Sequence, residues 1–561
     1  MCGSFILLLT SNDYEEMEIF RKTENFLIDI DLVIISFQII VLILVYYYSR
    51  SSILWILSVI SYILPFYFIS KSHSPLTISS IVLLFLTQHS IILSAQPYWG
   101  YGFGSDSIND LHIASVVMEQ EKLVLGQTGY GRTYYSYFPF LHIYTVMLSK
   151  ISGISVVNIA KYFIPLLNSF ITPLILFALN KEIGLDNEKN ILSILIFSLS
   201  WYYALFHSNF IREVYAFPIC LILLYSTIKI LKRDYIFNSI FYLMYLSLVY
   251  THQFSTYLII LNIIVIAFGY YLTKKSTIIN LNIISMFVLM LVNSIYIYYD
   301  LTRHYIISSI TALFGITERG SLEILPGRAS INVQLTLSYY LIVGILTLLG
   351  SYKLYFSDER KKYREYLPFL FFCLMLFGLS VLLRVSASGE WAYYMSRRGT
   401  IWAFLGMSII MTYGLDYVKK IDSRFVTQFI SIILIVLILS LGKVSQYPLH
   451  ITNSELEQDV RAMHYESAIW LNEYSEDGSW MLVQPKGIST RSRNLVLIIS
   501  TYAYLRQHYL YWMPYVRFEG YIPFVSSFYD QYLNQSDVAI IYSNGDVMIG
   551  YRTNPIEYPP G

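Results

Sequence analysis

Two carboxylates and an imidazole follow an aromatic and glycine-rich stretch, PYWGYGFGSD, at residues 97–106. They are Asp106, Asp110 and His112. If a helix begins near Ser105, Asp106 and Asp110 lie four residues apart on one helix face. Two carboxylates in that arrangement repel each other unless a cation or a shared proton lies between them. The pair therefore predicts a general base or a metal ligand, with helix capping by Ser105 or Asp106 as the alternative.

Two later turns carry further ionisable side chains. The segment HSNFIREVYAFP at residues 207–218 contains His207, Arg212 and Glu213. Charges at the end of an apolar run are costly, and they are usually functional or paired. A surface pair between Arg212 and Glu213 is the alternative. The turn YTHQFSTY at residues 250–257 contributes His252, for which packing or capping is the alternative.

The elements that position these residues are predicted by the distribution of charge. The chain has 561 residues, of which 56% are hydrophobic and 13% charged, whereas soluble domains carry about 25% charged residues. Long uncharged runs predict an all-α polytopic membrane protein with about 13 transmembrane helices of roughly 20 residues each. The shorter apolar stretch 136–151 predicts an interfacial or re-entrant helix. The expected spans cover residues 31–49, 52–70, 77–94, 157–180, 190–206, 214–231, 236–250, 254–272, 279–299, 335–353, 366–384, 399–418 and 425–441.

The loops between the spans predict the orientation. With a cytoplasmic N-terminus, the lysine-rich loops all lie inside, as the positive-inside rule requires; they hold Lys71 and residues 181–189, 232–233, 274–275, 360–364 and 419–424. The loops on the other side hold arginines after residue 200, and three of them crowd the turn 384–399. These three are Arg384, Arg397 and Arg398. Guanidinium groups bind phosphate bidentately, and headgroup contact or salt bridging is the alternative.

Four regions follow from this topology in a multi-pass protein of the cell membrane. They are an N-terminal tail with three leading spans (1–94), a first extracytoplasmic loop with juxtamembrane helices (95–156), the main transmembrane bundle (157–441) and a soluble extracytoplasmic domain (442–561). The last region ends with two alternating runs around Asn544 and Gly545, the residues preferred in a tight hairpin turn. A small α/β domain is expected there. The net charge of +1 gives no reason to expect a nucleic-acid partner.

In order and position these segments resemble the GT-C superfamily of membrane glycosyltransferases, near the archaeal oligosaccharyltransferases and protein O-mannosyltransferases. GSD at 104–106 stands in the place of the acidic motif of the first outer loop. YSYFPFLHIYTVMLSKISGIS at 135–155 is similar to the family's juxtamembrane helix, and SNFIREVYAFP at 208–218 occupies the place of the second acidic motif. The oligosaccharyltransferase signature WWDYG is absent, and EWAYY at 390–394 is no substitute. Sequon-directed transfer of an oligosaccharide is therefore not expected.

The resemblance implies a hexosyltransferase that moves a sugar from a dolichyl-type polyprenyl phosphate to a glycan, lipid or protein acceptor at the extracytoplasmic face. It implies that Asp106 is the base or metal-associated carboxylate and that Glu213 is a second acidic group. The two would also hold a divalent cation, Mg²⁺ or Mn²⁺. Substrate binding is expected from Asp110, His112, His207, Arg212, His252, Arg384, Arg397 and Arg398.

Two other classes of function fit parts of the sequence. A lipid-linked glycan polymerase or ligase would rely on the arginines, and its carboxylates would be dispensable. A non-enzymatic transporter or flippase would place charges at mid-membrane depth and show a repeated half-structure. The spans here are almost free of charge at mid-depth and no internal repeat is evident, which counts against transport.

Overall fold

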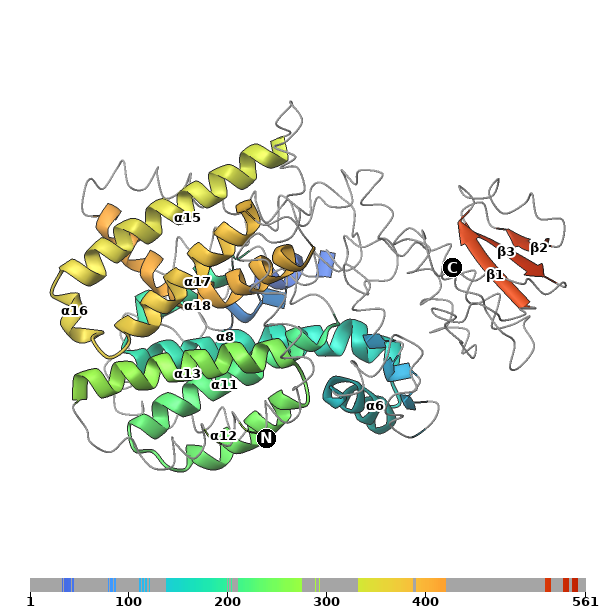
Figure 1. Cartoon of the computed structure of the whole chain (residues 1–561), viewed down its shortest axis with the longest axis horizontal. Helices are drawn as coiled ribbons and strands as arrows, with labels where there is room; N and C mark the ends of the chain where they lie inside the picture. Colours follow the sequence, from blue (N-terminus) through green and yellow to red (C-terminus); the bar gives the residue numbers. More distant parts are fainter. Residues whose placement is uncertain are drawn as a thin grey trace. The chain divides into compact units, whose positions relative to one another are not determined.

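The helices and strands come from a computed structural model of the whole chain (Figure 1). It describes residues 138–274 with gaps at 199, 201–202 and 204–209, residues 331–386 and 390–419, three strands after residue 519, Glu121, and scattered helical residues within 33–44, 79–86, 110–118 and 288–292. The predicted spans 52–70 and 425–441 lie outside the described residues. The chain divides into two compact units, Met1–Ile91 with Asn168–Phe206 and Ala216–Ser445, and Ile92–Leu167 with His207–Tyr215 and Gln446–Gly561.

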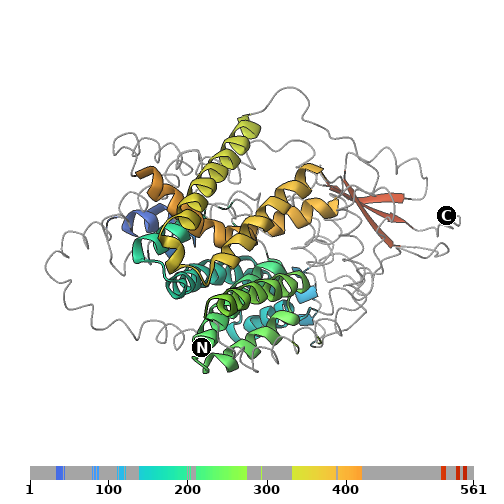
Figure 2. The same ribbon diagram turned by 60° about the vertical axis from the view of Figure 1, so that its left-hand side comes forward.

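One group of helices lies between residues 164 and 274. They are α8 (Ile164–Ile183), α9 (Asn187–Ser198), α11 (Arg212–Leu231), α12 (Phe237–Val249) and α13 (Gln253–Lys274). A second group is joined by the short helix α16 (Glu359–Lys362) and consists of α15 (Ile331–Phe356), α17 (Leu367–Ser386) and α18 (Glu390–Lys419). Figure 2 shows α15, α17 and α18 as neighbours in a view turned by 60°.

The apolar helices identify a membrane protein that is mostly helical. Among the described residues, four helical segments are long and apolar enough to cross a membrane: Leu166–Ile183, Arg212–Leu231, Gln253–Thr273 and Arg398–Val418. Apolar segments of this kind span bilayers as helices because every backbone polar group is then bonded within the segment. Shorter apolar helices cover Phe237–Val249, Leu341–Phe356 and Leu367–Val381. The total of about 13 spans and the orientation of the termini stay predictions.

Two predicted boundaries are wrong. The span expected at 190–206 is not one continuous helix, because α9 ends at Ser198 and the N–H of Ser200 donates to the carbonyl of Phe197 in a turn (2.9 Å). The segment 384–399 is not a turn crowded with arginines. Helix α17 runs through Arg384 to Ser386, and α18 already begins at Glu390, so that Arg397 and Arg398 lie about two turns inside it. Residues 391–398 contain no proline or glycine to end a helix there.

Glycines allow α15, α17 and α18 to approach closely. A Cβ atom on Gly350 would overlap the carbonyl oxygen of Ile410, and one on Gly414 would overlap the carbonyl oxygen of Leu346. A Cβ on Gly406 would lie 2.8 Å from Sγ of Cys373. Small residues at these positions let the helix backbones come close together. In a membrane the hydrophobic effect does not drive helices to associate, so such close packing stabilises their contacts instead.

The C-terminal strands form a three-stranded antiparallel sheet. They are β1 (Gly520–Val525), β2 (Val538–Ser543) and β3 (Val547–Arg552), in the order β1-β3-β2. Strands β2 and β3 pair from Val538 with Arg552 to Ser543 with Met548, as the predicted hairpin requires. The turn residues and the helix expected earlier in this region lie outside the described residues.

Helix α6 (Phe140–Ser152) anchors a separate apolar core in the second unit, together with α7 (Val156–Asn158) and the π-helical turn η3 (Ile159–Phe163). The helix follows Pro139 and ends at Gly153, whose positive φ of 71° closes the last turn. With 13 residues it is too short to span a bilayer, and it matches the short helix predicted at 136–151. Its buried face packs against helical residues 110–118 through side chains that include Leu111, Ala114, Val117, Leu141 and Val146.

Candidate functional site

The carboxylate of Asp110 is the centre of a buried polar cluster in the second unit. Its Oδ1 atom lies 2.9 Å from Nε2 of His142 and 3.1 Å from Nε of Arg212. Its Oδ2 atom accepts a hydrogen bond from the backbone N–H of Arg212 at 3.3 Å. One side chain therefore joins the first predicted loop, helix α6 and the start of α11. We call these three residues the Asp110 cluster.

The position of Arg212 explains why a carboxylate is stable in this place. Arg212 is the first residue of α11, a helix of 20 residues whose N-terminal N–H groups carry partial positive charge. The side chain of Asp110 is 1% exposed, and an ionised carboxylate buried to that degree needs close, opposite charge. Arg212 supplies that charge in two ways, through its guanidinium group and through its backbone N–H at the start of α11.

His142 and Phe138 complete the surroundings. Since the Asp110 carboxylate accepts, Nε2 of His142 carries the proton and donates. The guanidinium carbon of Arg212 lies 5.7 Å from the centre of the Phe138 ring, within cation–π range. Sequence reasoning missed His142. The available signal was its place on the face of α6 that also contains Leu141, Thr145, Val146 and Ser149, since a histidine on an otherwise core-facing stripe needs a polar partner.

Glu213 lies beside this cluster as the second residue of α11, and its side chain is buried. The structure thus brings together Asp110 from the first predicted loop and the Arg212–Glu213 pair from the segment 208–218. The alternative of an exposed surface pair does not hold, because both residues are less than a tenth exposed.

A second polar group lies at the first turn of α13, in the first unit. Nδ1 of His252 accepts the backbone N–H of Ser255 at 3.3 Å and lies 2.8 Å from the Ser255 hydroxyl. The guanidinium of Arg398, from α18, lies 5.7 Å from the ring of Phe254. His252 and Arg398, predicted from separate turns, therefore each contact a residue in the first turn of α13.

Several predicted residues have no described side chain. Asp106, His112 and His207 lie outside the described residues. Arg384 lies on helix α17 and Arg397 on helix α18, but the structure describes only the backbone of these two residues. Their predicted roles stay predictions.

The predicted metal ligands are Asp106 and Glu213, and of these two only Glu213 lies among the described residues. Within the described ranges, no three His, Cys, Asp or Glu side chains gather in a group suited to a metal ion. Both oxygens of Asp110 are engaged by hydrogen-bond donors, which does not fit a metal ligand. The buried carboxylate of Glu213 has the donor chemistry that Mg²⁺ or Mn²⁺ prefers.

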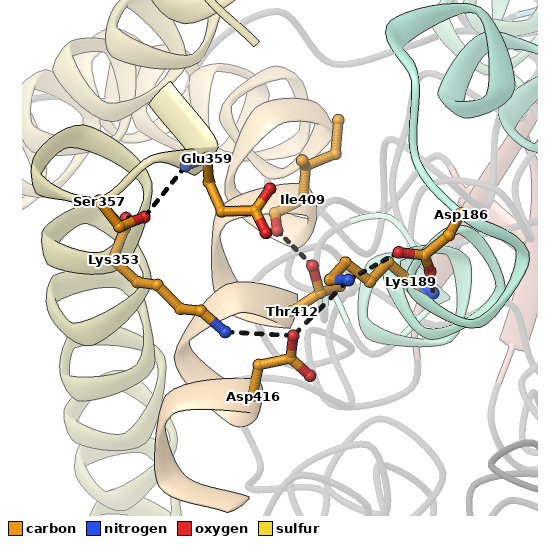
Figure 3. Close-up of polar contacts among 8 residues, drawn as sticks. All are labelled: Asp186, Lys189, Lys353, Ser357, Glu359, Ile409, Thr412 and Asp416. Carbon is orange, nitrogen blue, oxygen red and sulfur yellow. Dashed lines mark hydrogen bonds and ion pairs between the residues drawn. The ribbon is translucent and has the colours of Figure 1, made fainter. Parts of the chain in front are cut away.

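A third set of charges, which we call the lysine network, ties together helix ends near the lysine-rich loops (Figure 3). Lys189 lies 2.6 Å from Asp186 and 3.7 Å from Asp416, and Lys353 lies 3.3 Å from the same atom of Asp416. Partial burial opposes ionisation of Asp186, but the hydrogen bonds and charge of Lys189 outweigh it and lower the pKa of Asp186. These pairs connect the turn before α9 to α15 and α18.

Comparison with known proteins tests the fold. No family model and no curated protein matches the sequence. Among solved structures, ArnT from Cupriavidus metallidurans bound to undecaprenyl phosphate aligns at a TM-score of 0.51 and 8% identity, over 86% of this chain and 99% of that one. The Archaeoglobus fulgidus oligosaccharyltransferase in its apo form aligns at 0.50 and 9% identity, over 86% and 75%. The chain has the GT-C fold.

The predicted GT-C resemblance is therefore confirmed at the level of the fold. The same oligosaccharyltransferase tethered to an acceptor peptide aligns at a TM-score of 0.48 and 10% identity, over 77% of this chain. There the chain spans 64% of the length of its neighbour. A GT-C fold is a scaffold on which sites differ, so the activity has to be argued from the residues themselves.

Proposed function

We propose that this chain is a membrane glycosyltransferase that moves a sugar from a polyprenyl-phosphate donor to an acceptor at the extracytoplasmic face. The observation that carries the proposal is the Asp110 cluster, which joins the first predicted loop to the start of α11 in a chain of GT-C fold. The binding of undecaprenyl phosphate by ArnT supports a prenyl-phosphate donor.

Within this proposal, Asp110 and Arg212 are positioning residues. They neutralise each other and are both buried, so neither is well placed to exchange its partner for substrate. Asp106 precedes Asp110 by four residues in the sequence. We therefore propose that the contacts of Asp110 with the end of α11 help to position Asp106, as a second layer of hydrogen bonds does in other active sites.

In the proposed reaction Asp106 is the general base. The acceptor hydroxyl oxygen forms a bond to the anomeric carbon of the donor sugar, and the bond from that carbon to the phosphate oxygen breaks with inversion. The proton of the hydroxyl passes to Asp106, and the electron pair leaves with the prenyl phosphate. Positive groups stabilise the growing phosphate charge, a role suited to Arg397 and Arg398. A divalent cation held by Asp106 and Glu213 would supply further electrostatic stabilisation when bound.

The test compares two carboxamide variants in membranes that contain the full chain. Asp106→Asn removes the base and is expected to lower sugar transfer from labelled prenyl-phosphate donors by about 100-fold or more. Asp358→Asn is the matched control, because Asp358 is almost fully exposed beside α16 and takes no part in the proposed reaction. Both variants should be present at the wild-type level. Full activity of Asp106→Asn would remove this residue from the mechanism.

A third variant separates transfer by a carboxylate base from the polymerase or ligase alternative. Arg397→Gln should lower the rate less than Asp106→Asn if Asp106 is the base. The reverse order, with Asp106→Asn active and Arg397→Gln inactive, would favour a polymerase or ligase whose arginines carry the reaction.

A further inference from the structure

The turn around α16 lies between two apolar helices. The apolar parts of α15 and α17 cover Leu341–Phe356 and Leu367–Val381. Residues 357–366 separate them, and we call this segment the α16 turn. Because the helices on both sides are apolar, the α16 turn lies at a surface of the membrane. It is rich in charge, and its basic residues are Arg360, Lys361, Lys362 and Arg364.

Two buried tyrosines hold the α16 turn against the end of α8. The hydroxyl of Tyr363 donates to the carbonyl of Gly184 at 3.1 Å. The hydroxyl of Tyr366 donates to the carbonyl of Glu182, also at 3.1 Å. Both tyrosine side chains are buried. The backbone that carries the basic residues is therefore fixed, and a ligand does not have to order it.

The carboxylates of the α16 turn are paired or half-buried. Asp358 lies 3.2 Å from Lys361 in an exposed ion pair, in which the two charges cancel. Glu359 is half-buried and lies among the side chains of the lysine network (Figure 3). Glu365 is also half-buried, and its charge acts on Tyr270 of α13. Little negative charge is therefore left to balance the other basic side chains on the exposed side of the turn.

Arg360 and Arg364 carry the charge that is not balanced. Both are exposed, as is Lys362 between them. Among the described residues, neither arginine side chain forms an ion pair or a hydrogen bond. The ammonium of Lys362 lies 5.1 Å from the centre of the Tyr363 ring, and its charge also acts on Asp186. An arginine without a carboxylate partner can offer its planar donors to a phosphate group.

Exposed aromatic rings adjoin the turn at the end of α15. Phe356 is 80% and Tyr352 is 58% exposed, and the centres of their rings lie 5.6 Å apart. The ring of Tyr352 also lies 6.1 Å from the ring of Tyr417, on α18. Aromatic side chains at the end of an apolar helix lie at the level of lipid headgroups. A soluble acidic partner would account for the charge alone, whereas the bilayer surface accounts for both the charge and the rings.

We propose that the α16 turn is a binding surface for anionic phospholipids. Arg360 and Arg364 bind the phosphate groups, Lys362 adds to the local positive potential, and Tyr352 and Phe356 lie beside the headgroups. Basic clusters next to a membrane-spanning segment attract anionic lipid in this way. The lipid is a component of the bilayer and takes no part in sugar transfer, so this proposal does not depend on the function proposed above.

The experiment titrates the full chain in detergent with phosphatidylglycerol and measures the stepwise dissociation constants by native mass spectrometry. The double variant Arg360→Gln, Arg364→Gln should weaken the tightest phosphatidylglycerol site by about 20-fold, since each basic residue at an anionic lipid surface contributes about fivefold in affinity. Phosphatidylcholine, which has no net charge, should bind to the wild type and to the double variant equally.

The double variant Asp358→Asn, Lys361→Gln is the matched control. It removes a pair of opposite charges from the same turn and leaves the net charge unchanged. Its affinity for phosphatidylglycerol should stay within about twofold of the wild type. Asp358→Lys makes the opposite change, because it adds positive charge at a side chain that is 96% exposed. This variant should bind phosphatidylglycerol more tightly, and it keeps the test decisive if the double arginine variant fails to fold.

Three results would overturn the proposal. The first is a wild type that binds phosphatidylglycerol no more tightly than phosphatidylcholine, which would leave an acidic protein as the partner of this surface. The second is equal phosphatidylglycerol affinity in the wild type and the folded double arginine variant. The third is an affinity that does not fall when the ionic strength rises from about 0.05 M to about 0.5 M, because salt screens exposed charges over that range. A wild type that binds the lipid in the expected way but transfers no sugar contradicts only the function proposed above.

Discussion

The Asp110 cluster and the lysine network are both groups of ion pairs between distant segments, and they differ in burial and in balance. Asp110 is 1% exposed and is bound by an arginine, a histidine and a helix end. In the lysine network, Lys189 is 20% and Asp416 is 25% exposed, and two lysines face two aspartates. Water can replace partners in the second group but not in the first. The buried cluster is therefore specific and intolerant of change, whereas the partly exposed network is adaptable.

The largest expected effect is the loss of Arg212. In Arg212→Leu the Asp110 carboxylate stays buried with one charged partner removed, a change that typically costs about 3–5 kcal/mol of stability. Lys353→Leu makes the equivalent change in the lysine network and should cost at most about 1 kcal/mol, because solvent screens the charge of Asp416 that remains. Thermal unfolding of both variants in detergent measures the difference. Equal losses of stability in the two variants would contradict the comparison.

A smaller effect is expected at His142, and it separates hydrogen bonding from charge. His142→Leu leaves one oxygen of Asp110 with fewer donors and should cost about 1–3 kcal/mol. His142→Gln keeps an N–H donor at a similar reach and should recover most of that stability. If glutamine does no better than leucine, His142 acts through its charge or its shape, and the hydrogen bond to Asp110 is not what holds the cluster.

His142→Gln also distinguishes a positioning role from a merely structural one. A variant that keeps the stability of the wild type but displaces Asp110 slightly should lower kcat for sugar transfer with little change in KM. Loss of stability without a change in kcat would place His142 in the packing of α6 alone.

The sequence predicted most of what depends on local pattern. Uncharged runs predicted the positions of α11, α12, α13 and α15, because the bilayer demands long apolar segments. The span predicted at 399–418 matches the apolar segment Arg398–Val418. The turn predicted before it was wrong, because Glu390–Arg398 contains nothing that ends a helix and belongs to α18. Asp110 and Arg212 were both predicted as binding residues. Their contact was not, because pairing across such a separation is decided by how α6 packs on residues 110–118.

The smallest expected effect is the pH dependence of the stability that Asp186 contributes in the lysine network. The pKa of Asp186 is lowered from 3.8 by Lys189, so the folded state favours the ionised form and gains stability above the ordinary pKa. This contribution should be lost as the pH falls through the lowered pKa, below about 4.

The measurement is the difference in unfolding temperature between wild type and Asp186→Asn at a series of pH values. The difference should be small and constant near neutral pH and should shrink in acid. Because Lys189 also faces Asp416 at 3.7 Å, part of its charge stays balanced when Asp186 is protonated, which keeps the whole effect modest. A difference that grew toward acid pH would show that Asp186 is stabilised in its protonated form, and the lysine network would then resemble the buried cluster rather than contrast with it.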